Sequence, residues 1–214
     1  MPWVRPVTLE GEVVRLEPLA TGHLEGLAEV GLEPSIWRFM PVQPRSVDDL
    51  GAWLDAALRN AAAGLEVPFA TIDRRTGRPI GSTRFMALVP QHRRLEIGWT
   101  WLGGRYQGSG ANREAKWLQL AHAFEVLGAN RVELKTDADN SRSRAALLGI
   151  GASFEGIARD HMIVPGRIRH SAWYSVTVDD WPSVDARLRL AIGGRRLPSS
   201  PASGPSLAAP GGAQ

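Results

Sequence analysis

The chain has 214 residues, of which 43% are hydrophobic and 22% are charged, and this composition is ordinary for a globular domain. It contains no cysteine, which excludes a disulfide scaffold, a thiolate zinc site and a cysteine nucleophile. Its 25 basic and 22 acidic side chains are interspersed, so they favour a mixed solvated surface over a nucleic-acid interface.

Targeting and membrane signals are not evident in the sequence. The segment Met1-Pro2-Trp3-Val4-Arg5-Pro6 lacks the apolar run of a secretory signal. Apolar stretches stay shorter than the roughly 18 residues that a membrane-spanning helix requires. We therefore expect a cytoplasmic protein with no membrane partner.

The N-terminal third is predicted to contain one strand and two helices. Residues 11–17 indicate a strand, and residues 21–30 indicate a helix that Thr21 caps. A Ser-x-x-Asp capping box at Ser46 opens a second helix over residues 46–63.

The middle of the chain predicts a hairpin, a third strand and a strongly periodic helix. The hairpin strands are residues 67–73 and 79–88. The third strand, 94–102, runs directly into a glycine-rich loop, and the helix that follows covers residues 111–127.

The last part of the chain predicts a strand, a helix, a second hairpin and a final helix. These elements are a strand at 131–136, a helix from Asn140 or Ser141 to near Gly151, hairpin strands at 153–164 and 168–178, and a helix capped by Asp179 or Asp180 that ends near Leu190.

This order of elements predicts one α/β (α+β) domain over residues 1–190. We expect a mixed, mostly antiparallel sheet of six to seven strands flanked by helices, with a parallel junction near the two strand–helix units. Residues 191–214 consist almost entirely of small and polar residues. Such a segment buries too little apolar surface to offset its ordering entropy, so we predict a disordered tail.

The glycine-rich loop Arg105-Tyr106-Gln107-Gly108-Ser109-Gly110 is the strongest functional signal. It lies between a strand and a helix, where unpaired backbone N–H groups, the helix dipole and flexible glycines together form an anion cradle suited to a pyrophosphate. A simple connecting turn is the competing interpretation. The segment is not a Walker loop, because Gly-Lys-Ser/Thr is absent from it. A Rossmann fingerprint is disfavoured because Arg113 stands where its third glycine would be.

With this loop, the chain resembles the GCN5-related N-acetyltransferases, in particular the branch that acetylates ribosomal-protein N-termini. The loop satisfies the family pattern Q/R-x-x-G-x-G/A. Further matching segments are Val14–Leu19, Leu95–Trp99, Gly110–Lys116, Asn140-x-x-Ser143-Arg144-Ala145 and Gly151–Gly156. The resemblance covers roughly residues 10–188 in register.

The resemblance implies acetyl-coenzyme A as co-substrate, without a metal. N–H groups from about Gln107 to Asn112 would hold the pyrophosphate, and strand residues Trp99 to Trp101 would pair with pantetheine like an added strand. The implied coenzyme-binding residues are Trp99, Thr100, Trp101, Arg105, Gln107, Gly108, Ser109, Gly110, Ala111, Asn112 and Asn140.

Glu96 and Ser143 are the candidate catalytic residues. The acceptor amine must be neutral to attack, and Glu96, on the strand before the loop, is the candidate base. Ser143 matches the serine that the family branch places near the coenzyme sulfur, although a first-turn helix residue that bonds its own backbone is the alternative. Asn140 could cap the helix or bond pantetheine.

Aromatic residues could line the acceptor pocket or belong to the core. The pocket candidates are Trp37, Phe39 and Trp173, with Trp99 and Trp101 as further options. His161 and His170 on the last hairpin do not have the spacing of a metal site.

Departures from the family pattern concern mainly the acceptor side. They are Gly149 late in a helix, Arg169-His170 where an acidic residue usually follows the arginine, and the short turn Pro165-Gly166.

We therefore expect an N-acetyltransferase that acts on a primary amine by direct attack in a ternary complex. A protein N-terminus, a polyamine, an aminoglycoside-like drug and an amino-acid derivative are all open as acceptors, and so is a homodimer. The alternatives are a non-catalytic acyl-coenzyme A-binding domain and a transferase for a longer acyl group.

Overall fold

The computed structural model describes residues 2–193. The predicted domain boundary at residue 190 falls slightly early, because Ala191 and Ile192 still belong to the last helix, α6 (Trp181–Ile192). The predicted disordered tail lies, from residue 194 onward, outside the described residues.

One mixed sheet organises the described residues, and it has eight strands in the order β1-β2-β3-β4-β5-β6-β8-β7. The strands are β1 (Leu9–Glu10), β2 (Val14–Pro18), β3 (Val67–Asp73), β4 (Pro79–Val89), β5 (Arg94–Leu102), β6 (Arg131–Asp137), β7 (Ser153–Val164) and β8 (Arg167–Thr177). Neighbouring strands are antiparallel except β5 and β6, which are parallel. The predicted sheet class is confirmed. The predicted number of strands is too low by one, because the two-residue β1 is too short to show an alternating pattern.

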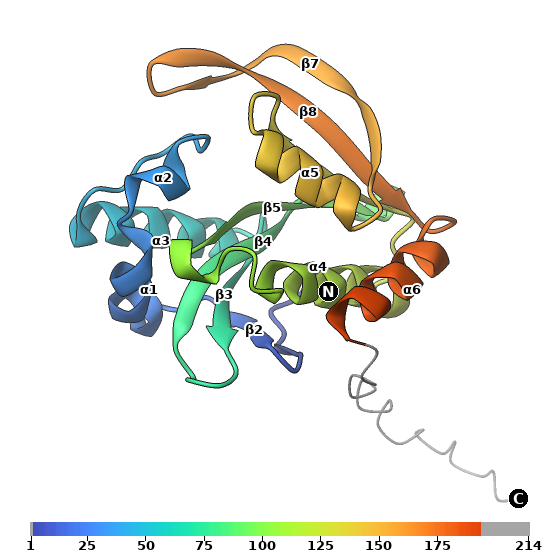
Figure 1. Ribbon diagram of the computed structural model, residues 1–214, viewed down its shortest axis with the longest axis horizontal. Coiled ribbons are helices and arrows are strands. Elements are labelled where there is room, and N and C mark those ends of the chain that lie inside the picture. The colour runs from blue at the N-terminus through green and yellow to red at the C-terminus, as the bar shows by residue number, and fades with distance from the viewer. Residues whose placement is uncertain (1, 194–214) are drawn as a thin grey trace, which may run out of the picture.

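Helices cover both faces of this sheet (Figure 1). They are α1 (Leu24–Gly31), α2 (Pro34–Trp37), α3 (Val47–Ala62), α4 (Ala111–Ala121), α5 (Ser141–Gly149) and α6. Side chains of α1–α3 share one buried cluster with Ala70 and Trp101, whereas those of α4–α6 share another with Phe69 and Leu95. Because Phe69 and Ala70 are adjacent in β3, the two clusters lie on opposite faces of the sheet.

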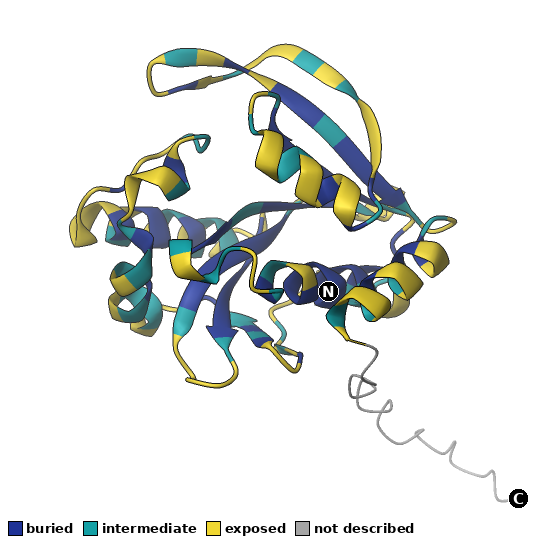
Figure 2. Cartoon of the chain, in the orientation of Figure 1, coloured by how far each residue is buried: buried dark blue, intermediate teal, exposed yellow. Residues whose placement is uncertain are grey.

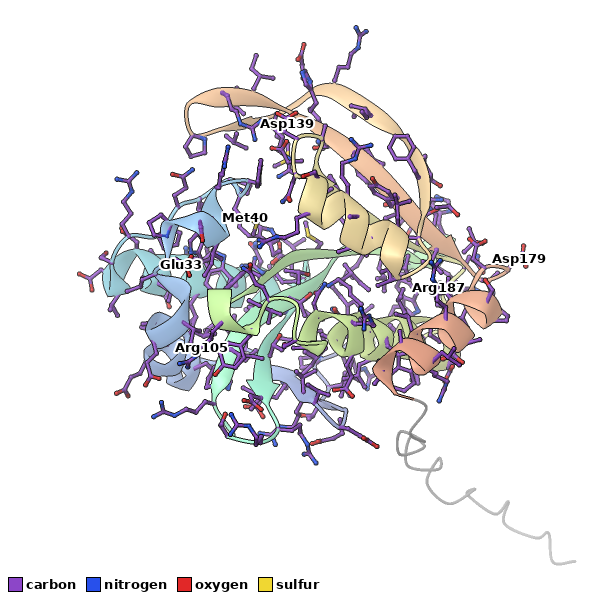
Figure 3. All side chains as sticks on the ribbon, viewed as in Figure 1. Glu33, Met40, Arg105, Asp139, Asp179 and Arg187 are labelled. Atoms are coloured by element: carbon purple, nitrogen blue, oxygen red, sulfur yellow. The ribbon has the colours of Figure 1, made fainter. Side chains whose placement is uncertain are left out.

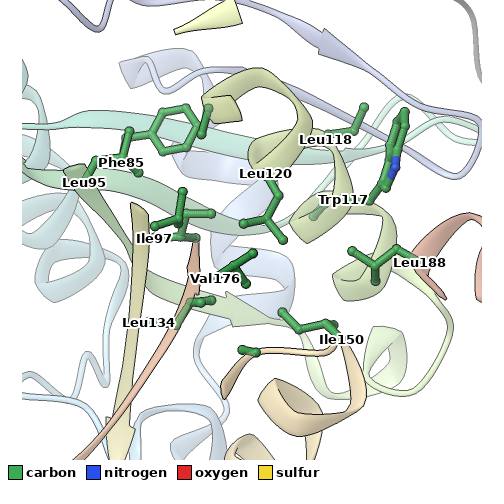
Figure 4. Close-up of a cluster of buried hydrophobic side chains, with 14 of the residues drawn as sticks. Phe85, Leu95, Ile97, Trp117, Leu118, Leu120, Leu134, Ile150, Val176 and Leu188 are labelled. Carbon is green, nitrogen blue, oxygen red and sulfur yellow. The ribbon is translucent and has the colours of Figure 1, made fainter. Parts of the chain in front are cut away.

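The second cluster is the larger one, and Figure 4 shows its centre, where Leu120 of α4 lies beside Ile97 and Val176 of the strands. Burial is concentrated in the central strands and in α4, while β7 at the sheet edge is largely exposed (Figure 2).

Local signals located most helix ends correctly, with three corrections. The capping box at Ser46 is confirmed, since its hydroxyl accepts the N–H of Asp49 at 3.1 Å. Thr21 begins a 3₁₀ turn, Thr21–His23, rather than capping α1. Asp180 precedes α6, but its carboxylate accepts from Thr177 instead of capping the helix. The α-helix predicted to reach residue 127 ends at Ala121, and a π-helical segment, His122–Val126, follows it directly.

The parallel junction opens the sheet. β5 and β6 pair from Arg94↔Arg131 to Ile97↔Leu134, and their pairing ends there. Beyond this point β5 stays with β4, and β6 stays with β8. The divergence leaves a gap between two adjacent strands near the middle of the sheet.

A β-bulge at Trp99 changes the direction of the side chains on β5. Trp99 has a φ of +50°, and the β4–β5 register shifts between Ser82 and Arg84. Strict alternation would put Trp101 on the same face as Ile97, but the bulge sends Trp101 to the α1–α3 cluster and returns Leu102 to the α4 cluster.

A buried carboxylate attaches the first strands to α4. Glu114, in the first turn of the helix, is 0% exposed. It accepts three backbone N–H groups, from Glu12 at 2.9 Å, Val13 at 2.7 Å and Val14 at 2.6 Å. The arrangement gives the backbone donors of the β1–β2 turn a charged acceptor and holds the start of α4 in place.

Glu114→Gln should destabilise the fold by about 2–3 kcal/mol, because the amide nitrogen cannot accept and the charge is lost, while the Val14 donor stays buried and the other two stay partly buried. Urea unfolding measures the effect. Glu25→Gln makes the same chemical change in the exposed first turn of α1 and should alter stability by at most about 0.5 kcal/mol. Equal effects of the two substitutions would contradict the assigned role of Glu114.

Candidate functional site

A cavity of about 320 Å³ occupies the gap between β5 and β6. Its walls come from these two strands, the loop before α4, the first turns of α4 and α5, the segment after α2, and single residues of β4, β7 and β8. The cavity therefore collects residues that are far apart in the sequence, and Figure 3 labels one of them, Met40, in the segment after α2.

The glycine-rich loop forms one end of the cavity. Gly108 and Gly110 have φ values of +78° and +90°, which glycine adopts without strain. Gly110 is the N-cap of α4 and offers no capping side chain, and the N–H of Ala111 donates to the Ser109 hydroxyl at 3.4 Å. A Cβ added at either glycine would meet none of the described atoms within 4 Å, so the space above the loop is open. These features match the anion cradle predicted from the sequence.

Asn112 provides a second observation at this end. Its side-chain oxygen is buried and has no hydrogen-bond partner among residues 2–193, although the residue lines the cavity. A buried acceptor without a partner is costly, so a ligand that carries a donor would fit here.

Two other predicted loop residues face elsewhere. The Arg105 guanidinium lies 4.9 Å from the centre of the Tyr106 ring. The Ser109 hydroxyl donates to the Tyr106 carbonyl at 2.6 Å, and Ser109 borders a separate hollow beside Arg113 and Ala191. Only Gln107 and Gly108 of this loop segment line the main cavity.

Asn140 and Ser143 lie across the cavity from the loop, at the start of α5. The Asn140 side chain accepts the Ser143 N–H at 3.0 Å, so Asn140 is the helix cap that the sequence predicted. Both residues line the cavity, as does Arg142, whose guanidinium donates to the Gln107 side chain and bridges the gap.

The bulged part of β5 forms the floor of the site. Trp99, Thr100 and Trp101 all border the cavity. The Arg84 guanidinium lies 4.7 Å from the Trp99 ring centre and 5.0 Å from that of Trp53, so it is held between two indoles.

Thr100 points in the opposite direction and contacts Lys116 of α4. The Lys116 ammonium donates to the Thr100 hydroxyl at 2.7 Å and to the Thr83 hydroxyl at 3.3 Å, and Gln119 is 3.5 Å away. No carboxylate of the described residues pairs with it, and burial lowers the pKa of Lys116 to about 7. Lys116 was not predicted as a site residue, because helical periodicity in the sequence does not reveal that α4 is buried almost all round from Glu114 to Leu120.

Glu96 stands at the other end of the cavity and is 3% exposed. Burial raises the pKa of the Glu96 carboxyl, and the Lys135 ammonium, which donates to it at 3.2 Å, opposes this effect. Its side chain faces opposite to Leu95, as strand alternation predicted. A buried carboxylate with a raised pKa inside a cavity can exchange a proton with a bound amine.

Arg169 and Asp137 were not recognised as site residues from the sequence, where Arg169 stood out only as a departure from the family pattern. Arg169 is 5% exposed, lies 3.8 Å from the Asp137 carboxylate, and donates to the Phe39 carbonyl at 3.2 Å. Arg167 also pairs with Asp137. Arg169 thus connects β8 to the segment after α2, and both residues line the cavity.

Of the three predicted pocket aromatics, only Phe39 lines the cavity. Trp37 is 0% exposed and packs against Trp53 and Trp101, with ring centres 5.8 and 5.1 Å away, so it belongs to the core. Trp173 lies outside the cavity and packs against Lys135. The sequence could not separate these cases because the tryptophans have similar apolar surroundings along the chain.

Within residues 2–193, no group of three His, Asp or Glu side chains could hold a metal ion. In the same range, none of the helices combines the length and apolar character needed to cross a membrane.

Comparison with known proteins agrees with this geometry. A family model described as Acetyltransferase (GNAT) domain matches residues 14–153. The Bacillus subtilis (strain 168) protein named "Putative ribosomal N-acetyltransferase YdaF" is 34% identical over 145 residues, which are 68% of this chain and 78% of that protein.

Solved structures share the fold. A GCN5-related N-acetyltransferase from Brucella melitensis is 31% identical with a TM-score of 0.83, and the match covers 90% of this chain and 88% of that one. Mycobacterium smegmatis RimJ, solved in complex with CoA-disulfide, is 22% identical with a TM-score of 0.74 over 88% of this chain and 95% of that one. The chain therefore belongs to the GNAT family and is an acyl-coenzyme A-dependent N-acetyltransferase.

Proposed function

We propose that the cavity between β5 and β6 binds acetyl-coenzyme A and transfers its acetyl group directly to a primary amine. The observation that carries this proposal is that one continuous cavity joins the glycine cradle of the 105–110 loop to the buried carboxylate of Glu96. An anion site at one end and a base at the other are what direct transfer between two bound substrates requires.

The residues present fit the coenzyme. The first-turn N–H groups of α4 and the positive-φ glycines Gly108 and Gly110 would hold the pyrophosphate. The free edge of β5 from Gly98 onward would pair with the pantetheine amides, and Asn112 and Asn140 would add side-chain bonds. Bound in this way, the coenzyme supplies a thioester as the acyl donor. Arg105 and Ser109 would contact the coenzyme only at the rim of the loop, because both side chains lie against Tyr106 outside the main cavity.

Glu96 would act as the base. It accepts a proton as the amine nitrogen forms its bond to the acetyl carbon and the carbon–sulfur bond breaks. Ser143, which lines the cavity at the start of α5, would donate a hydrogen bond to the departing sulfur. Lys116 would hold the bulged strand in place through Thr100, because the ammonium donates to that hydroxyl from beneath β5.

A catalytic role is favoured over a purely coenzyme-binding one. The Glu96 carboxyl lies in the cavity at a buried position that disfavours its charge, and coenzyme binding alone gives no reason for a carboxyl there. The name of the Bacillus subtilis relative points to ribosomal protein, so a protein N-terminus is one acceptor class for this chain. A cytoplasmic location is compatible with that acceptor, and a homodimer stays a prediction.

Glu96→Gln should lower kcat by about 100-fold and remove the rising limb of the pH–rate profile. The limb exists because only the ionised carboxylate accepts a proton, and burial raises the pKa of Glu96, so the rate climbs with pH through that raised value. Steady-state kinetics from pH 5 to 9 check this. Affinity for acetyl-coenzyme A, measured by calorimetry, should stay within about twofold. An unchanged profile in the variant would exclude Glu96 as the base.

Gly108→Glu should weaken acetyl-coenzyme A binding at least tenfold, because a carboxylate would meet the pyrophosphate and a side chain is strained at a φ of +78°. Gly77→Glu is the matched control, since Gly77 has a φ of +69° and lies in the exposed β3–β4 turn far from the cavity. The control should show a similar loss of stability with normal coenzyme affinity. Normal affinity in Gly108→Glu would refute the cradle.

Lys116→Met should raise the melting temperature at pH 7, because it removes a buried charge that has no carboxylate partner within the described chain. The pKa of Lys116 is about 7 when folded and 10.5 in the ordinary case, so the unfolded chain holds more protons between these values and the native protein gains stability as pH rises. The advantage of the variant should therefore shrink towards pH 10. Lys135→Met, which breaks the ion pair with Glu96, should not stabilise. A lower melting temperature for Lys116→Met would contradict this account.

A further inference from the structure

Every methionine within residues 2–193 lines the same cavity. They are Met40 after α2, Met86 on β4 and Met162 on β7, which are distant in sequence and belong to different elements. All three side chains are partly buried. Ile36, Phe39 and Pro41 line the cavity beside Met40.

These side chains gather around Glu96. Met86 and Glu96 are direct partners across β4 and β5. A Cβ added at Gly98 would lie 2.6 Å from the Met86 sulfur and 3.1 Å from the Glu96 Oε1, so both side chains reach the same point above Gly98. The acceptor amine must approach this point to be deprotonated.

Met162 and Met40 meet the same end of the cavity from the other side. Met162 is the cross-strand partner of Arg169, and Arg169 donates to the carbonyl of Phe39, the residue before Met40. In Figure 3 Met40 lies in the segment beyond α2, at the edge of the open space below the β7–β8 hairpin. The wall around Glu96 therefore combines thioether, aryl and alkyl groups with the cations Lys135 and Arg169.

The two carboxylates at this end are already paired, whereas the buried Nε of Arg169 has no hydrogen-bond partner within residues 2–193. Asp137 is 1% exposed and pairs with Arg167, with Arg169 also 3.8 Å away, and Glu96 accepts from Lys135. Among the residues that line the cavity, these are the two carboxylates. A second ammonium on the acceptor would find no unpaired anion, and a polyhydroxylated body would face carbon and sulfur.

We propose that the acceptor is a primary amine whose amine-bearing carbon carries an uncharged apolar group, alkyl or aryl. The inference rests on the proposed function, because Glu96 must be the base for this wall to surround the acceptor. Methionine side chains are flexible and polarisable, so the wall accommodates apolar groups of more than one shape. A free amine and a peptide that begins with a large apolar residue present the same chemistry.

Thiol release from acetyl-coenzyme A tests the acceptor class with matched amines. The probes are 2-phenylethylamine and isopentylamine against ethanolamine and spermidine, together with a pair of peptides that begin with Leu or Ser. The expected kcat/KM is at least about tenfold higher for the apolar member of each comparison, since each methylene in such a pocket contributes about tenfold or more. A preference seen only with the peptides identifies an N-terminus as the source of the amine, and a preference seen only with the free amines identifies a small molecule.

Met162→Gln tests the wall directly, because glutamine has a similar size but a polar end. It should reduce the apolar-to-polar ratio of kcat/KM about tenfold, while the KM for acetyl-coenzyme A stays unchanged. Met162→Leu should retain the ratio. Ile163→Gln is the matched control, since Ile163 is the next residue of β7, is 88% exposed and points to the opposite face.

Equal turnover of polar and apolar amines, or a ratio that Met162→Gln leaves intact, would overturn this inference and leave the proposed function standing. The proposed function itself would fail differently, with no coenzyme binding and no thiol release for any amine.

Discussion

The early end of pairing between β5 and β6 is the constraint on which the rest of the site depends. Four parallel pairs hold the strands together, and after Ile97↔Leu134 each strand stays with its other neighbour. The divergence exposes a free edge of β5 and places the starts of α4 and α5 on either side of it. Without this gap, the loop at Gly108 and the carboxylate of Glu96 would be separated by a closed sheet.

The bulge at Trp99 makes the free edge usable. It sends Trp101 into the α1–α3 core and directs Thr100 onto Lys116, so that one residue anchors the strand to each layer. Lys116 is a buried ammonium with no carboxylate partner among residues 2–193, which weakens the fold, so its place under the strand fits a positioning role rather than a stabilising one. Glu114 acts in the opposite sense, because its three backbone bonds stabilise the same helix.

The two ends of the cavity differ in polarity. Near α4 and α5, amides, Gly108 and Arg142 surround the space, whereas near Glu96 the methionines, Phe39 and Ile36 line it together with Lys135 and Arg169. This asymmetry suits a polyanionic donor and an apolar acceptor that meet at one point. The raised pKa of Glu96 follows from the apolar end, because desolvation there disfavours the charged carboxylate.

Local sequence alone determined the element order, the Ser46 capping box, the Asn140 cap and the position of the glycine-rich loop before α4, because these depend on contacts between residues near each other in the chain. The order of elements in turn indicated the mixed sheet class. It also indicated Glu96, through its place on the strand before the loop. Tertiary structure decided the rest. Trp37 and Trp173 do not line the cavity, although the sequence suggested that they would. Lys116, Arg169 and the methionines do line it, because β-bulges, strand divergence and contacts between distant elements set which way these side chains point. The two-residue alternation of a strand sequence does not reveal where a bulge shifts the register, so it does not predict which face a side chain reaches after the bulge.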